Sequence, residues 1–238
     1  MASRRIKHEA LAILAAYPAD EADRRLASRW REEELIHPLF SALCNVDELG
    51  RFRAIDVFGR VLARLSARDM EAARVVMRRL LWSLNDESGG IGWGAPEAMA
   101  SAIALSRPLA DEYLHMLISY LKEDGEEPCQ DGNFLELPFL QRGLLWGIGH
   151  VAASLKERLL AMGVAEEMAK YLRSPDQTVV GLALWCLSRL GVATALPIMP
   201  VDESAVLRLY ENGALHSLSL AELARRVVST PPLPPATR

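Results

Sequence analysis

The chain has 238 residues, enough to bury a sizeable core, and half of its residues are hydrophobic. Its formal net charge of −4 gives no broad electrostatic case for nucleic acid binding, which normally rests on a basic patch or stripe. Three dispersed cysteines without a Cys-x-x-Cys pair argue against a disulfide framework and against a zinc knuckle.

The N-terminal segment begins with basic residues, but charged residues and Pro18 interrupt its apolar stretch, so it does not match a signal peptide. No apolar run reaches the ~18 residues that a membrane span needs. We therefore expect a cytoplasmic protein without a membrane-spanning helix.

Apolar residues recur with helical spacing along almost the whole chain, and the strong helix formers Ala and Leu are abundant. Gly163 and Gly191 stand where the end of a helix favours a left-handed residue. Runs of β-branched residues are absent, so we expect an all-α fold. The predicted helices cover residues 5–17, 20–29, 32–44, 47–65, 67–84, 95–105, 108–123, 137–154, 155–162, 164–173, 176–191, 203–211 and 219–228.

Residues 51–79 hold eight arginines against three acidic residues, so this stretch is locally cationic. A solvated helix face is the favoured interpretation. A small anionic partner is the alternative.

Three helices share a tryptophan in a similar apolar setting, at Trp82, Trp146 and Trp185. The interval between the last two, 185 − 146 = 39 residues, is that of one HEAT or armadillo unit. Residues 176–191 include Asp176, Val180, Ala183, Leu187, Leu190 and Gly191. With these residues the segment resembles the second helix of a HEAT repeat, although Gly181 stands where that family usually has arginine.

The segment 85–94 with its flanking helices is also similar to an uncharacterised bacterial family of HEAT-like proteins. This resemblance implies a right-handed α–α superhelix of antiparallel helix pairs. We assign residues 1–228 to this single domain and the proline-rich residues 229–238 to a flexible tail. The resemblance implies a binding role and no chemistry.

The tryptophans lie off the main apolar stripe of their helices. Arg78 precedes Trp82 by one turn, and Arg142 stands in the same relation to Trp146, with His150 one turn beyond. Packing between repeats is the favoured interpretation, and a ligand surface of Arg and aromatic side chains is the alternative. Gly143, Gly147 and Gly149 in the second of these helices indicate that something approaches this helix closely, and a neighbouring helix is one candidate.

The loop 85–94 contains four glycines around Ile91 and Trp93, so its backbone has unusual freedom. A packed structural loop is favoured over a binding loop and, more strongly, over a catalytic loop. A dinucleotide-binding motif needs a preceding strand, where a helix is predicted. The five histidines show no metal-binding spacing, and we predict neither a metal nor a cofactor.

We predict that the acidic loop and the ridge of Arg142, Trp146 and His150 meet in one pocket. The favoured function is a non-enzymatic helical-repeat scaffold that binds a protein or peptide partner there. The alternative is a small-molecule-binding protein or a lyase- or glycosylase-like enzyme that uses acidic residues of 85–97. The candidate binding residues are Arg78, Trp82, Asn85, Asp86, Glu87, Ser88, Trp93, Glu97, Arg142, Trp146 and His150.

Overall fold

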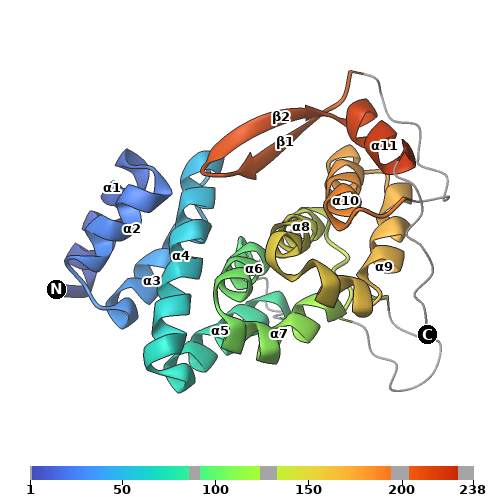
Figure 1. Cartoon of the computed structure of the whole chain (residues 1–238). Coiled ribbons are helices and arrows are strands. Elements are labelled where there is room, and N and C mark those ends of the chain that lie inside the picture. Colours follow the sequence, from blue (N-terminus) through green and yellow to red (C-terminus); the bar gives the residue numbers. More distant parts are fainter. Residues whose placement is uncertain (1, 86–91, 124–132, 194–203, 230–238) are drawn as a thin grey trace. The chain divides into compact units, whose positions relative to one another are not determined.

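A computed structural model of the chain describes residues 2–85, 92–123, 133–193 and 204–229 (Figure 1). In these residues there are eleven α-helices, one 3₁₀ turn and one two-stranded hairpin. The predicted helical class is thereby confirmed, while the superhelical arrangement of the helices stays a prediction. Most of the predicted tail, residues 230–238, lies outside the described residues.

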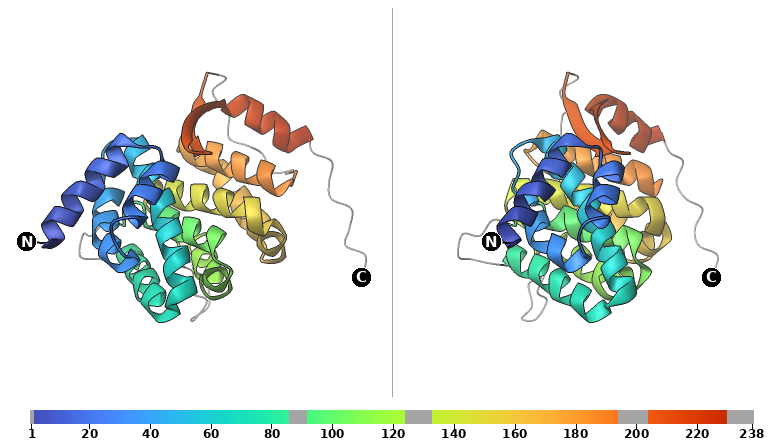
Figure 2. Two further views of the ribbon diagram at one scale, coloured as in Figure 1. Left: turned by 60° about the vertical axis from the view of Figure 1, so that its left-hand side comes forward. Right: turned by 90° about the vertical axis from the view of Figure 1, so that its left-hand side faces the viewer.

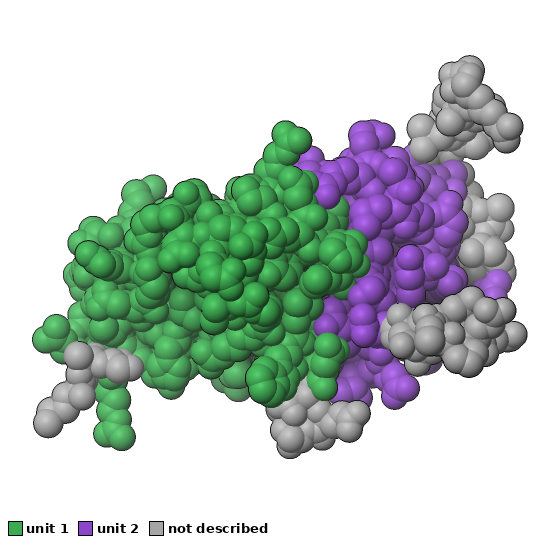
Figure 3. All heavy atoms as spheres, turned by 90° about the horizontal axis from the view of Figure 1, so that it is seen from below, with its two compact units in different colours: residues 1–117, 210–215 green, residues 118–209, 216–238 purple. Residues whose placement is uncertain are grey.

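The chain forms two compact units, coloured separately in Figure 3. Unit 1 consists of residues 1–117 and 210–215, and unit 2 consists of residues 118–209 and 216–238. The chain therefore returns to unit 1 for six residues near its C-terminal end. The predicted single repeat domain over residues 1–228 stays a prediction.

Unit 1 is built around a central helix, α4, which packs against the helices before and after it. The contact between α4 and α6 is unusually close at Gly59, where an added Cβ would lie 2.1 Å from the Ser101 Oγ on α6. The helices of this unit are α1 (Ala2–Ala16), α2 (Ala19–Ala27), α3 (Glu32–Leu43), α4 (Glu48–Arg68), α5 (Met70–Asn85), α6 (Ala95–Leu105) and most of α7 (Arg107–Ser119).

Most arginines of the cationic stretch 51–79 have carboxylate partners within unit 1. Arg64 donates to both oxygens of Asp23 at 2.8 and 2.9 Å, and Arg74 donates to Glu112. Three further arginines pair in the same way: Arg60 with Asp20, Arg68 with Glu32 and Glu33, and Arg78 with Glu71. This arrangement supports the interpretation of a solvated, ion-paired helix face over a site for an anion.

Unit 2 is built around α10 (Gln177–Leu190), which packs on α8 (Pro138–Ala161), α9 (Val164–Lys170) and α11 (Leu220–Ser229). A 3₁₀ turn, Tyr171–Arg173, follows α9. Leu155 interrupts α8 with non-helical backbone angles, at the boundary that was predicted between residues 154 and 155. Gly163 and Gly191 have the predicted left-handed conformation, with φ of 73° and 65°.

A hairpin of β1 (Val206–Glu211) and β2 (Ala214–Ser219) precedes α11 (Figure 2). The prediction of a helix over 203–211 is therefore wrong. Asn212 and Gly213 both have positive φ, 52° and 81°, as the two central residues of a type I′ turn require. This turn matches the twist of paired strands, so the Asn-Gly pair favours a hairpin over a helix.

The tip of the hairpin belongs to unit 1, where Tyr210 is buried against α4. Its ring stacks on Phe52, with ring centroids 4.8 Å apart, and its hydroxyl donates to Asp56 Oδ2 at 2.6 Å. Burial raises the pKa of Asp56 although this hydrogen bond lowers it.

Among the described helices, none has the length and apolar character needed to cross a membrane.

Candidate functional site

The described ends of the predicted loop are held close to helix α5 in unit 1. A Cβ on Gly92 would lie 2.8 Å from the Ser83 carbonyl oxygen, so only glycine lets the chain pass this close to the end of α5. Gly94 then adopts a left-handed conformation, with φ of 69°, and caps the start of α6. The candidate residues Asp86, Glu87 and Ser88 lie outside the described residues.

Large apolar side chains are exposed on this part of unit 1. Trp82 is 74% exposed on α5, and Val75 on the same helix face is 56% exposed. Trp93, which directly follows Gly92, is 41% exposed, and Asn85 at the end of α5 is also exposed. Single apolar residues on a surface are ordinary, but two exposed indoles near one helix end are characteristic of a contact surface.

Glu97, in the first turn of α6, is buried in unit 1 and only 6% exposed. Its Oε2 atom has no hydrogen-bond partner among the described residues. Burial raises the pKa of Glu97, against the smaller opposing effects of a backbone hydrogen bond and of the Arg51 charge. A carboxyl group with a raised pKa is suited to proton transfer, but its depth below the surface favours a structural role.

Replacing Glu97 by methionine is expected to increase the free energy of unfolding by about 1–3 kcal/mol at pH 8, because a carboxyl group whose ionised form burial disfavours is replaced by an apolar side chain of similar volume. The folded-state pKa lies above the unfolded value of 4.5. The stability contributed by Glu97 is therefore fully present below pH 4.5 and is lost as the pH rises through the folded-state pKa. Urea unfolding should accordingly show a larger gain at pH 8 than at pH 5.

The exposed Glu166 on α9 provides a matched control, and Glu166→Met should leave stability almost unchanged. A lower stability of Glu97→Met at pH 8 would contradict this expectation, because it would mean that the interactions of the Glu97 carboxyl group outweigh the cost of its burial.

The candidate residue Arg142 forms an ion pair at one end of α10 in unit 2. Its Nη2 and Nε donate to Asp176 Oδ2 at 2.5 and 3.1 Å. Asp176 Oδ1 accepts from the backbone N–H groups of Thr178 and Val179 and so caps α10. Burial raises the pKa of Asp176, but the Arg142 hydrogen bond and the backbone donors together outweigh burial and lower it.

Trp146 and His150 stack on each other along α8, with ring centroids 4.9 Å apart. Trp146 is 3% exposed and Trp185 is 6% exposed, so both indoles pack inside unit 2. A Cβ on Gly149 would lie 2.1 Å from Trp185 Cζ3. The indole of Trp185 is therefore the group that approaches α8 closely at this glycine. The tryptophans of unit 2 therefore serve packing, whereas Trp82 in unit 1 faces solvent.

The predicted residues thus belong to two groups. Asn85, Trp93 and Trp82 belong to unit 1, and Arg142 and His150 belong to unit 2. That the loop and the α8 ridge share one pocket stays a prediction. Among the described residues, no three His, Cys, Asp or Glu side chains are grouped closely enough to hold a metal ion.

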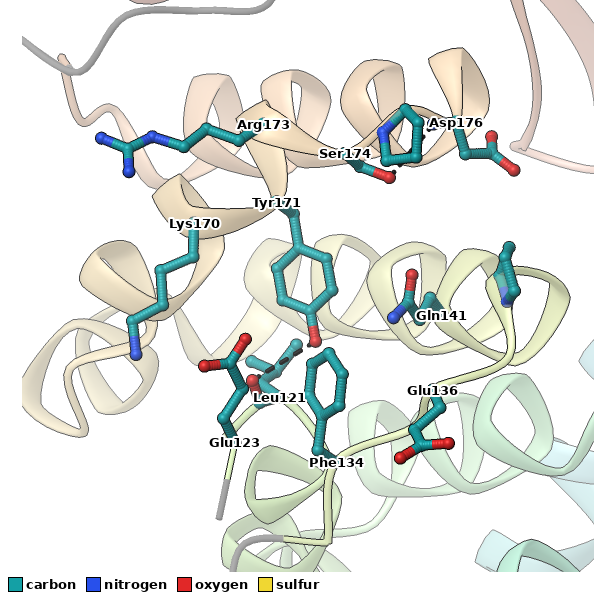
Figure 4. A pocket seen from close by; sticks show the side chains of 12 residues that line it. Leu121, Glu123, Phe134, Glu136, Gln141, Lys170, Tyr171, Arg173, Ser174 and Asp176 are labelled. Carbon is teal, nitrogen blue, oxygen red and sulfur yellow. Dashed lines mark hydrogen bonds between the residues drawn. The ribbon is translucent and has the colours of Figure 1, made fainter. Parts of the chain in front are cut away.

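A separate cavity of about 330 Å³ lies within unit 2, between the start of α8, the 3₁₀ turn and the described residues 121–123 and 133–136 (Figure 4). This volume is within the usual range for small-molecule pockets. Phe134 and Tyr171 both line it, and their ring centroids are 6.2 Å apart. The side chains of Glu123, Glu136 and Gln141 also line it.

Sequence reasoning did not find this cavity, because its lining comes from three separate segments that form no motif. Of the residues that line the cavity, only Asp176 stood out in the sequence, as a match to the HEAT pattern. In comparisons with known proteins, no protein-family model matches the chain, and no curated protein matches it.

Proposed function

We propose that the protein is a non-enzymatic helical-repeat scaffold of the HEAT or armadillo kind that binds a protein partner through the exposed surface of α5 around Trp82. The single observation that supports this function most strongly is the exposure of the Trp82 indole, at 74%. Tryptophan is enriched among the residues that dominate binding energy in protein interfaces, where its ring fills an apolar pocket.

The solvent-facing stripe of α5 has the composition of a contact surface. Val75, Arg78, Trp82 and Asn85 follow one another at three- and four-residue spacing and are all exposed. Two apolar side chains thus alternate with two polar ones on one helix face. An interface core with a polar rim has this mixture.

The charges on this surface define the partner. Arg78 pairs with Glu71 at 2.7 Å, but both side chains are more than half exposed, so the pair contributes little and can be exchanged. Arg79 lies over the ring of Phe40, 4.1 Å from its centroid, and keeps its positive charge at the surface. The surface therefore fits a partner with an apolar pocket for the indole and acidic residues around it.

The test places a photo-reactive benzoylphenylalanine at position 82 in the native cell, with the fully exposed position 46 as the control. A partner that crosslinks from position 82 and not from position 46 is then purified. Trp82→Ala should weaken its binding about 30-fold or more, as expected for an interface hot spot. Val46→Ala should leave the affinity unchanged.

Equal crosslinking from both positions, or a purified partner that binds Trp82→Ala as tightly as the wild type, would contradict the proposal. Because Trp82 faces solvent, the variant is expected to fold, and its thermal unfolding curve serves as the check.

A further inference from the structure

We infer that the cavity in unit 2 is a binding site for a small organic cation, one that carries an ammonium, amidinium or guanidinium group on a flat apolar body. The inference is independent of the protein-binding surface proposed on α5. It follows from the acceptors, the charges and the aromatic rings that line the cavity.

Two neutral side chains of the lining offer acceptors to a ligand. Gln141 is 9% exposed, and its Nε2 donates to the Leu135 carbonyl oxygen at 2.7 Å. Its Oε1 has no hydrogen-bond partner among the described residues. The Tyr171 hydroxyl donates its proton to the Leu121 carbonyl oxygen at 3.3 Å, so toward a ligand it can only accept. A ligand with several N–H donors satisfies these groups.

The charges of the lining select a cation. Glu123 and Glu136 line the cavity and have no ion-pair partner among the described residues. Asp176 also lines it, but Arg142 from outside the cavity neutralises that carboxylate. Two uncompensated carboxylates therefore remain beside the aromatic pair.

The basic residues of the lining do not cancel these two charges. The Lys170 ammonium pairs at 2.7 Å with Glu167, which does not line the cavity. The Arg173 side chain extends away from Tyr171 and Phe134, as Figure 4 shows. Counted over the whole lining, three carboxylates stand against the two basic side chains, so the lining has one excess negative charge.

The aromatic pair completes the site. Phe134 and Tyr171 are inclined at 31° to each other, which leaves a flat apolar body able to lie against a ring. A cation beside an aromatic face gains from the electrostatic attraction of the ring in addition to the carboxylates. Burial raises the pKa of the Tyr171 phenol, and so do the nearby charges of Glu167 and Glu123, so the phenol remains neutral.

The test measures binding of three probes of nearly equal shape to the full chain by calorimetry or ligand-observed NMR. Benzamidine is cationic, benzamide is neutral and benzoate is anionic. We expect benzamidine to bind with at least about 10-fold higher affinity than benzamide, and benzoate not to bind. N-acetyl-arginine amide, as a fourth probe, shows whether a peptide side chain is accepted as well as a free small cation.

The variant Glu123→Gln/Glu136→Gln removes both charges at the surface and should lower the affinity for benzamidine about 10-fold or more, with benzamide unaffected. Glu166→Gln, on the exposed side of α9, is the matched control and should bind as the wild type does. Benzamidine binding that equals benzamide binding, that persists in the double variant, or that is absent at millimolar concentration would overturn the inference.

Discussion

Replacing Gly149 by alanine is expected to reduce the free energy of unfolding by about 1–3 kcal/mol, the usual cost of overpacking a core. The same substitution inside a helix is ordinarily favourable by ~1 kcal/mol, so the expected effect has the opposite sign to helix propensity. The reason is steric, because the new methyl group would lie 2.1 Å from Trp185 Cζ3 and 2.5 Å from Cε3. Trp185 is 6% exposed and surrounded by packed side chains, so its ring cannot simply move aside.

A double-mutant cycle with Trp185→Leu isolates this contact. In the Trp185→Leu background, Gly149→Ala should cost nothing or should increase stability slightly, because the ring is gone and the methyl fills part of the space. Urea unfolding of the four proteins measures the coupling. A Gly149→Ala variant as stable as the wild type would show that α8 and α10 can separate at no cost.

Acidification from pH 6.5 to pH 4 is expected to remove up to about 3 kcal/mol of stability through His150 alone. Burial lowers the pKa of His150 to about 4, with a smaller contribution from the charge of Arg189, against 6.5 for the free side chain. Between these values the unfolded chain binds the proton more tightly than the folded one. Stability is therefore complete above pH 6.5 and falls as the pH drops toward 4.

His150→Phe tests this expectation, because phenylalanine retains a ring beside Trp146 and cannot be protonated. The stability of the variant relative to the wild type should increase by up to about 3 kcal/mol between pH 7.5 and pH 4, since other titrating groups contribute equally to both proteins. The stability gained by His150→Phe thus grows as the pH falls, whereas the stability gained by Glu97→Met grows as the pH rises. A constant difference across this range would mean that His150 is protonated in the folded state at its ordinary pKa.

The helices could largely be predicted from the sequence because their signals are local. Apolar spacing defined the interior of each helix, and Gly163 and Gly191 marked two ends that the backbone angles confirm. The hairpin was missed because Leu, Arg and Glu in residues 206–211 are also good helix formers. Asn212-Gly213 was the local signal that should have decided the assignment, since a type I′ turn requires positive φ at both positions.

The candidate sites were less accessible to sequence reasoning, because exposure and convergence are tertiary properties. Trp82 and Trp146 occupy equivalent places in their helices, yet one is exposed and the other is buried. Periodicity showed that both lie off the main stripe and could not show which one a neighbour covers. The cavity presents the same difficulty, since Phe134, Gln141 and Tyr171 come together only after three segments have packed.

The return of residues 210–215 to unit 1 has a consequence for synthesis on the ribosome. Tyr210 supplies the ring that covers Phe52 and the hydroxyl that reaches Asp56, but it follows the end of α4 by 210 − 68 = 142 residues. At translation rates of about 5–20 residues per second, α4 waits roughly 7–28 s for this partner. During that interval the nascent chain exposes an apolar ring and a carboxylate that the finished protein covers, and a chain cut after residue 117 exposes them permanently.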